Sequence, residues 1–152
     1  MTVESAQAGS REETSGRLRV RVAAKQDEAT DIVSFELVAE SGGPLPALGA
    51  GPPIDGHVRE GLVRQYSLCN DPAERHRYLI AVLQEPSSRG GSKAMHESIE
   101  VGDVLTISAP RNHFQLATGT RHLLLAGGIG VTPILSMAVR LAASGIDFEM
   151  RF

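Results

Sequence analysis

Residues 64–68, with the sequence RQYSL, place an arginine, a tyrosine and a serine close together on one predicted strand. On a strand, Arg64 and Tyr66 face one side, whereas Gln65 and Ser67 face the other. An arginine guanidinium can form two parallel hydrogen bonds with a phosphate, and a tyrosine ring offers a flat face for stacking. The pattern therefore indicates a site for a phosphate-bearing ring compound. An ordinary amphipathic strand with a tyrosine in the core would show the same pattern.

A second segment, residues 87–93, forms a glycine-rich turn ahead of a short predicted helix. Its sequence, SSRGGSK, carries Arg89 and Lys93 on either side of two consecutive glycines. Consecutive backbone N–H groups in such a turn can bind an anion. The alternative is a surface loop with no ligand.

The third segment, residues 127–133, has the sequence GGIGVTP, follows a predicted buried strand and opens a predicted helix. It departs from the G-x-G-x-x-G dinucleotide fingerprint, because Pro133 stands where the third glycine would be. The segment is either a turn that a nucleotide approaches closely or a tight turn without a ligand.

The other reactive residue types indicate no further site. Cys69 is the only cysteine, which excludes an internal disulfide and an all-cysteine metal cluster within this chain. We interpret it as a buried structural thiol rather than a redox thiol. The five histidines show neither H-x₃-H nor HExxH spacing, so the sequence predicts no metal site.

The elements that must position these motifs begin with two strands. Residues 17–23 alternate polar and apolar side chains with the period of a half-buried strand, and residues 30–38 have high β propensity. Residues 41–53, with four glycines and four prolines, are predicted to be loop. Further strands are predicted at 54–58, 62–68, 77–84 and 104–108, and a short helix at 92–99. Six short strands linked by turns favour an antiparallel barrel or sandwich.

The last part of the chain has a different pattern. Residues 122–126 contain an unbroken apolar run, which is typical of a strand buried on both faces of a parallel sheet. Thr132 is predicted to cap the following helix, with Pro133 at its first position. The helix ends near residue 143, and residues 146–152 begin another strand. Such a strand–helix–strand unit belongs to a larger α/β domain.

The sequence pattern predicts the domain organisation, and the composition excludes several classes of protein. We predict a disordered tail over residues 1–15, a β domain over 16–117 and the first part of an α/β domain over 118–152. The net charge of −3 and the 4% aromatic content give no basic face for nucleic acid, and no apolar run is long enough for a membrane span. The N-terminus lacks the regions of a signal peptide, so we expect a cytoplasmic protein.

In their order, the three motifs resemble those of the ferredoxin-reductase-type flavin reductases, most closely the phthalate dioxygenase reductase and vanillate O-demethylase reductase branch. Residues 61–72, 77–82 and 89–92 carry the likeness, which extends over residues 16–152. The resemblance implies a mainly β fold, with a six-stranded antiparallel Greek-key flavin-binding barrel. The first βαβ part of an α/β nucleotide-binding domain would follow the barrel.

The resemblance also implies roles for single residues. Tyr66 would stack on the isoalloxazine ring, Ser67 would lie near flavin N5, and Thr132 would lie near the contact between flavin and nicotinamide. The implied cofactor-binding residues are Arg64, Gln65, Tyr66, Ser67, Ala81, Val82, Leu83, Gln84, Arg89, Gly90, Gly91, Ser92 and Lys93. The implied nucleotide-binding residues are Gly127, Gly128, Gly130, Thr132 and Pro133.

The implied cofactor is FMN, with FAD as the alternative, and the implied co-substrate is NADH. Residues 92–110 contain no Phe, Tyr or Trp on which an adenine could stack, which favours FMN. Members of the branch pass electrons through a C-terminal plant-type [2Fe–2S] domain to the oxygenase component of a two-component aromatic oxygenase or O-demethylase. This chain has no C-x₄-C-x₂-C spacing, and we predict that it is truncated after the start of the NAD domain. The alternative function is therefore a flavin-binding or partner-requiring fragment that is inactive alone.

Two features predict local irregularity. Pro52 and Pro53 remove two backbone donors from the third strand, whose pairing we expect to be altered. A lone strand–helix–strand unit cannot cover both faces of its sheet. Residues 123–125 would therefore pack imperfectly or mediate self-association through the incomplete sheet.

Overall fold

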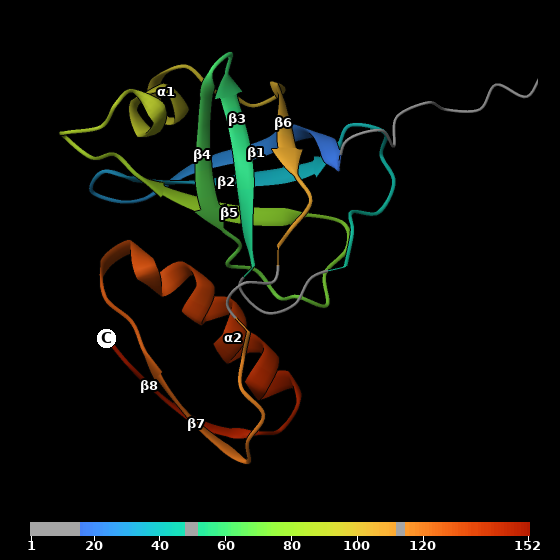
Figure 1. Cartoon of the computed structure of the whole chain (residues 1–152), viewed down its shortest axis with the longest axis vertical. Helices are drawn as coiled ribbons and strands as arrows, with labels where there is room; N and C mark the ends of the chain where they lie inside the picture. Colours follow the sequence, from blue (N-terminus) through green and yellow to red (C-terminus); the bar gives the residue numbers. More distant parts are fainter. Residues whose placement is uncertain (1–15, 48–51, 112–114) are drawn as a thin grey trace, which may run out of the picture.

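The computed structural model describes residues 16–47, 52–111 and 115–152. The tail predicted over residues 1–15 and part of the predicted loop, residues 48–51, lie outside the described residues. A six-stranded antiparallel sheet comes first, and a two-stranded parallel sheet with one long helix follows it (Figure 1). None of the helices in these three ranges has the length and apolar character that crossing a membrane requires.

The six-stranded sheet is closed into a barrel. Its elements are β1 (Arg17–Ala29), β2 (Ile32–Ala39), β3 (Pro53–Arg59), β4 (Leu62–Ser67), β5 (Tyr78–Leu83), α1 (Gly91–Glu97) and β6 (Val104–Ser108). The strand order is β4-β3-β6-β1-β2-β5, and an antiparallel bridge from Leu68 to Ile80 joins the two ends of the sheet. The position of β6 between β3 and β1 gives the Greek-key connection. The predicted six-stranded antiparallel barrel is confirmed.

The first strand is longer than the sequence predicts. Residues 17–23 are predicted, whereas β1 continues to Ala29. Its pairing with β2 shifts register between Val22 and Ala24 and again between Asp27 and Ala29. A bulge inserts a residue and bends a strand without ending it. The alternation of side chains changes phase at the first shift, which explains why the sequence pattern stops there.

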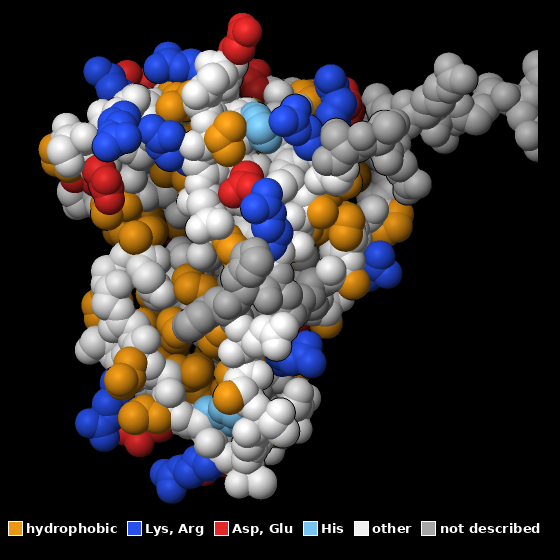
Figure 2. Space-filling view, viewed as in Figure 1, with side chains coloured by type: hydrophobic (Ala, Val, Ile, Leu, Met, Phe, Trp, Pro, Cys, Tyr) orange, Lys and Arg blue, Asp and Glu red, His pale blue; other side chains and the backbone are white. Residues whose placement is uncertain are grey.

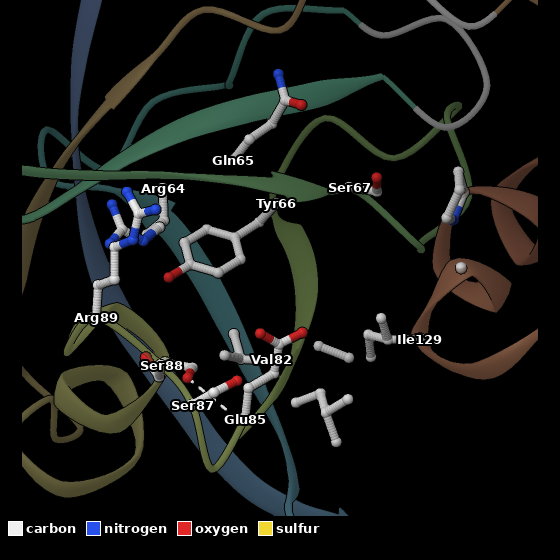
Figure 3. Close-up of a pocket in the computed structure, with 15 residues that line it drawn as sticks. Arg64, Gln65, Tyr66, Ser67, Val82, Glu85, Ser87, Ser88, Arg89 and Ile129 are labelled. Carbon is white, nitrogen blue, oxygen red and sulfur yellow. Dashed lines mark hydrogen bonds between the residues drawn. The ribbon is translucent and has the colours of Figure 1, made fainter.

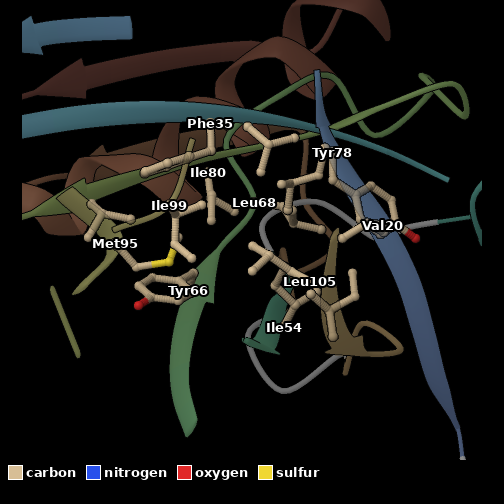
Figure 4. Close-up of a cluster of buried hydrophobic side chains, with 14 of the residues drawn as sticks. Val20, Phe35, Ile54, Tyr66, Leu68, Tyr78, Ile80, Met95, Ile99 and Leu105 are labelled. Carbon is tan, nitrogen blue, oxygen red and sulfur yellow. The ribbon is translucent and has the colours of Figure 1, made fainter. Parts of the chain in front are cut away.

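One apolar cluster fills the barrel (Figure 4). Phe35, Leu37 and Tyr78 are fully buried in it. The Tyr78 hydroxyl donates a hydrogen bond to the carbonyl of Pro46 at 2.7 Å. The loop that follows β2 is therefore fastened over one end of the core.

The prolines alter one edge of β3, as expected. Pro53 is the first residue of the strand, where a missing donor is tolerated. The pairing of β3 with β6 is limited to Gly56 and His57 on the β3 side. The Asp55 N–H instead donates to the Ser108 hydroxyl at 2.8 Å. A side chain thus replaces part of the ladder.

The second part comprises β7 (Arg121–Leu125), the 3₁₀ turn η1 (Gly128–Gly130), α2 (Val131–Ala143) and β8 (Asp147–Arg151). Leu124 packs with the buried face of α2, which lies between this sheet and the barrel (Figure 1). Leu123 and Leu125 are 59% and 65% exposed. The apolar run is typical of a strand buried on both faces, but within the described residues α2 covers only one face of β7, as predicted for a lone strand–helix–strand unit.

The start of α2 also differs from the prediction. Gly130 is the N-cap residue and α2 begins at Val131, so the predicted cap at Thr132 is wrong. The preceding 3₁₀ turn continues into the helix, and the Thr132 hydroxyl donates back to the Ile129 carbonyl at 3.0 Å. Pro133 is the third helical residue instead of the first. It is tolerated there because the first four N–H groups of a helix have no acceptor within it.

Candidate functional site

The candidate site lies at the seam where the barrel closes. In the described chain, the bridge from Leu68 to Ile80 is the single point of pairing between β4 and β5. Beside it, the Cys69 N–H donates to the Leu79 carbonyl across the seam at 2.9 Å. Main-chain groups alternate in direction along an antiparallel strand. Those of Ala81 therefore face the seam as well, next to the point where the pairing stops.

A cavity of about 570 Å³ opens at this seam (Figure 3). Its volume falls within the range of about 300–1,000 Å³ that is typical of small-molecule sites. One wall comes from β4, the second from β5 and the turn before α1, and the third from the η1 turn. The cavity therefore lies between the barrel and the second part of the chain.

The structure brings most of the predicted site residues together. Those that line the cavity are Arg64, Gln65, Tyr66, Ser67, Ala81, Val82, Leu83, Arg89, Ser92, Gly130 and Pro133. Those that do not line it are Gln84, Gly90, Gly91, Lys93, Gly127, Gly128 and Thr132. The lining residues that the sequence does not predict are Glu85, Ser87, Ser88 and Ile129. Ile129 and the serines stand within or beside glycine motifs, which is a usable signal, whereas no local pattern marks Glu85.

Two arginines contribute positive charge to the cavity. Arg64 and Arg89 both line the cavity, and their side chains occupy the same part of the close-up (Figure 3). Neither takes part in an ion pair with a carboxylate of the described residues. Arg64 donates one hydrogen bond to the neighbouring Val63 carbonyl at 2.8 Å. Like charges in proximity repel, so a bound phosphate would stabilise this arrangement.

The double glycine before α1 lets Arg64 reach this position. A β-carbon built on Gly91 would lie 2.7 Å from both Cγ and Nε of Arg64. Gly90 has a φ of +97°, in the left-handed region that favours glycine. Arg64 can therefore pack against the turn because Gly90 and Gly91 have no side chains.

Tyr66 links the cavity to the barrel core. The residue is 9% exposed and belongs to the apolar cluster (Figure 4). Its hydroxyl is buried without a hydrogen-bond partner among the described residues, and it points toward the Arg64–Arg89 end (Figure 3). Burial raises the pKa of Tyr66 to about 12, although the charge of Arg64 opposes the shift. An unsatisfied buried hydroxyl costs about 1–3 kcal/mol, so a ligand that accepts its hydrogen bond is favoured.

Side-chain hydrogen bonds to main-chain carbonyls fix the C-terminal end of α1 against the barrel. Lys25 Nζ donates to the carbonyls of His96 and Ile99 at 2.7 Å each. His96 Nε2 donates to the Val82 carbonyl at 2.7 Å. Since Val82 is a cavity residue on β5, these contacts hold α1 and the β5 wall in a fixed relation.

Two other residues of interest lie outside the cavity. Thr132 is 6% exposed and its hydroxyl is used within the turn that carries Ile129. Burial raises the pKa of Cys69 to about 11, and its Sγ donates to the Leu79 carbonyl at 3.3 Å. A thiol with a raised pKa is unreactive near neutral pH, but Cys69 is half-buried, and the structural role of this cysteine stays a prediction.

No protein-family model matches the chain, but curated proteins match most of its length. The vanillate O-demethylase oxidoreductase of Pseudomonas putida is 61% identical over 132 residues, which are 86% of this chain and 41% of that protein. The phthalate dioxygenase reductase of Burkholderia cepacia is 46% identical over 132 residues, with the same two shares. The chain thus spans about two fifths of the length of these relatives.

Solved structures give the same result for the fold. A phthalate dioxygenase reductase, described as a modular structure for electron transfer from pyridine nucleotides to [2Fe–2S], matches with a TM-score of 0.86 and 45% identity over 89% of this chain and 43% of that chain. The flavohaem-like FAD/NAD-binding domain of nitric oxide dioxygenase from Vibrio cholerae O1 biovar El Tor matches with a TM-score of 0.74 and 27% identity, over 89% and 63%. In sequence and in fold, the chain is therefore a homologue of the vanillate O-demethylase and phthalate dioxygenase reductases over the part of those proteins that it spans.

Proposed function

We propose that this chain is the flavin-binding part of an NAD(P)H-dependent oxidoreductase. The complete protein would pass electrons from NADH through FMN to an iron–sulfur centre that serves an aromatic-ring oxygenase or O-demethylase. The observation that carries the proposal is the seam cavity, which is lined by Arg64, Arg89 and Tyr66. Among the described residues, neither arginine has a carboxylate partner and the Tyr66 hydroxyl has no hydrogen-bond partner. Residues 16–117 would form the flavin domain, and residues 118–152 the start of the nucleotide domain.

The chemistry of the cavity fits FMN. Arg64 and Arg89 would bind the terminal phosphate through charge-assisted hydrogen bonds. The Tyr66 hydroxyl would donate to the phosphate or to the adjoining ribityl chain. The main chain of β5 from Ala81 to Leu83 would meet the polar edge of the ring. Stacking of the Tyr66 ring on the isoalloxazine stays a prediction, and the small exposed fraction of Tyr66 limits it to the side that faces the cavity.

The residues of this chain would position the reactants. Flavin supplies the redox chemistry when bound, since it accepts a hydride and releases electrons singly. Ser67 and Ile129 border one cavity from opposite parts of the chain. A nicotinamide that entered along the η1 turn would therefore reach the ring beside Ser67, while the Ile129 side chain would exclude water. Gly127, Gly128 and Thr132 would contact the nucleotide farther out.

The choice of FMN rests on the phosphate end of the cavity. Arg64 and Arg89 suit a terminal phosphate, and residues 92–110 offer no aromatic ring to an adenine. The names of the relatives, which are reductases of demethylase and dioxygenase systems, support an oxygenase component as the partner. The cytoplasmic location stays a prediction from the sequence.

Identification of the cofactor tests the proposal. The purified chain should be yellow, and heat should release a flavin that chromatography identifies as FMN. Arg64→Gln should lose most of the flavin, whereas Arg21→Gln, which removes the same charge from the exposed face of β1, should retain it. A predominance of FAD would refute the choice of FMN. Failure to bind either flavin would refute the function.

The exposed face of β7 favours a second candidate function for the 152-residue chain alone. Leu123 and Leu125 are left uncovered, although parallel sheets are stable when both faces are covered. The chain by itself would then bind flavin without supporting transfer from NADH, and it would need a further polypeptide segment or partner for activity.

A further inference from the structure

The β3–β4 hairpin carries a third arginine to the glycine-rich turn. Arg59 is the last residue of β3, and the chain reverses at Gly61, which has a φ of +73°. A β-carbon built on Gly90 would lie 3.0 Å from Nη2 of Arg59. Gly90 and Gly91 therefore each leave room for a different arginine, Arg59 over the first and Arg64 over the second.

Glu85 lines the same cavity as Arg64 and Arg89, and Glu60 lines the same hollow as Arg59, but neither carboxylate is paired with these arginines. Among the described residues, no carboxylate forms an ion pair with Arg59, Arg64 or Arg89. The chain has 18 acidic residues against 15 Lys and Arg, and many of its other cations are paired. In the space-filling view, Lys and Arg side chains gather over the region of α1 and the neighbouring hairpin (Figure 2). Positive charge concentrated in this way is stabilised by a bound anion.

We propose that Arg59 is a specificity-determining residue for the flavin, and this inference rests on the proposed function. Arg59 lines a hollow other than the seam cavity, and from the other side of Gly90 its guanidinium would add to the positive charge that the terminal phosphate of the cofactor meets. It thereby favours a flavin that carries a phosphate monoester. Such a monoester has a charge of about −1.5 to −2 at pH 7, whereas riboflavin carries no phosphate. Arg59 would attract the phosphate through its charge and would make no contact with the flavin ring.

Two ligands that differ only in the phosphate isolate this contribution. Arg59→Gln should raise the dissociation constant of FMN about three- to tenfold, as expected for the loss of an exposed charge close to the phosphate. The dissociation constant of riboflavin should not change. Arg59→Lys should keep part of the preference because it keeps the charge. Both constants are measured from flavin fluorescence at fixed ionic strength.

Arg21→Gln is the matched control. Arg21 is exposed on β1 and borders a different surface hollow, so its loss changes the net charge equally without touching the turn. Both flavins should bind this variant as they bind the unmodified chain.

Each remaining outcome counts against the inference. Equal weakening of FMN and riboflavin binding by Arg59→Gln would show that Arg59 supports the fold instead of recognising phosphate. Unchanged binding of FMN would show that Arg59 is a solvated surface residue. If the unmodified chain bound neither flavin, the proposed function itself would fail, and the inference with it. Flavin binding by the unmodified chain therefore distinguishes the two failures.

Discussion

Gly91→Ala tests whether the approach of Arg64 to the turn before α1 is part of cofactor binding. The added β-carbon would lie 2.7 Å from Cγ and Nε of Arg64 and 3.2 Å from its Cδ. These atoms lie in the middle of the side chain, so a rotation of the guanidinium tip cannot relieve the clash. The φ of Gly91 is outside the left-handed region, so alanine fits the backbone there. The clash therefore displaces the Arg64 side chain, whereas the backbone at position 91 can keep its conformation.

The two expected effects have opposite signs. Loss of a hydrogen bond to a charged group weakens an interaction by about 1.5–3 kcal/mol. Because about 1.4 kcal/mol is a factor of ten, the dissociation constant of FMN should rise about ten- to 150-fold. Replacement of a glycine by alanine lowers the entropy of the unfolded chain and stabilises the folded state by about 0.4–1 kcal/mol. The free energy of unfolding of the flavin-free protein should therefore stay near its original value while Arg64 repacks.

The assay combines an FMN titration by fluorescence with thermal unfolding of the flavin-free chain. Gly43→Ala is the matched control, since a β-carbon there would meet Ser41 Oγ at an ordinary 3.7 Å. It should leave the FMN affinity unchanged and, by the same effect on the unfolded chain, raise the unfolding temperature slightly. A folded Gly91→Ala protein with the original FMN affinity would refute the assignment of Arg64 to the phosphate.

Three further predictions follow from single contacts. Tyr66→Phe removes a hydroxyl that has no partner in the described residues, so the flavin-free chain should unfold at the same temperature or higher. Its FMN affinity should fall about two- to tenfold, and unchanged affinity would contradict the role of the hydroxyl. The folded state favours the protonated Cys69 thiol, since its pKa is raised from 9.0 to about 11. The contribution of Cys69 to the free energy of unfolding should therefore be full below pH 9 and be lost as the pH rises through 11. In denaturant titrations, the stability of Cys69→Ala should fall less over this pH range than that of the unmodified chain. Equal pH dependence of the two proteins would contradict the prediction. Finally, the 152-residue chain should bleach its flavin very slowly with NADH in stopped-flow mixing and should self-associate in sedimentation experiments. Leu125→Lys should reduce the self-association, and rapid complete bleaching would show that the exposed sheet face does not limit activity.

Strands and turns could largely be predicted from the sequence, because the alternation of side chains reports which face is buried. The predicted β6 coincides with the observed strand. The second half of β1 could not be predicted, since the shift after Val22 changes the phase of the alternation. The Thr132 cap failed for a different reason: a hydroxyl can donate to a carbonyl behind it as well as accept from a helix, and the local sequence is the same in both cases.

The walls of the site could be predicted, but its closure could not. Residues 64–67 and 81–83 face each other because the barrel closes through Leu68 and Ile80, and this pairing is not apparent in either strand's own pattern. Glu85 enters the cavity because the chain turns after β5. The approach of Arg59 to Gly90 joins a hairpin tip to a distant turn, and such a contact depends on the whole topology.

The two ends of the cavity are supported by different parts of the chain. Under the proposed function, cofactor binding and cofactor reduction would therefore depend on different parts. The phosphate end is built on the barrel, whose apolar cluster is distinct from that of the second part, and Lys25 and His96 fasten α1 to it. The opposite end is lined by Ile129 on a three-residue turn, supported by a sheet with one uncovered face. Substitutions that loosen the packing around Leu124 should therefore shift this turn while the arginine cluster stays in place. Under the proposed function, affinity for flavin would therefore depend on the barrel, whereas access of the nicotinamide would depend on how firmly β7, β8 and the η1 turn are held.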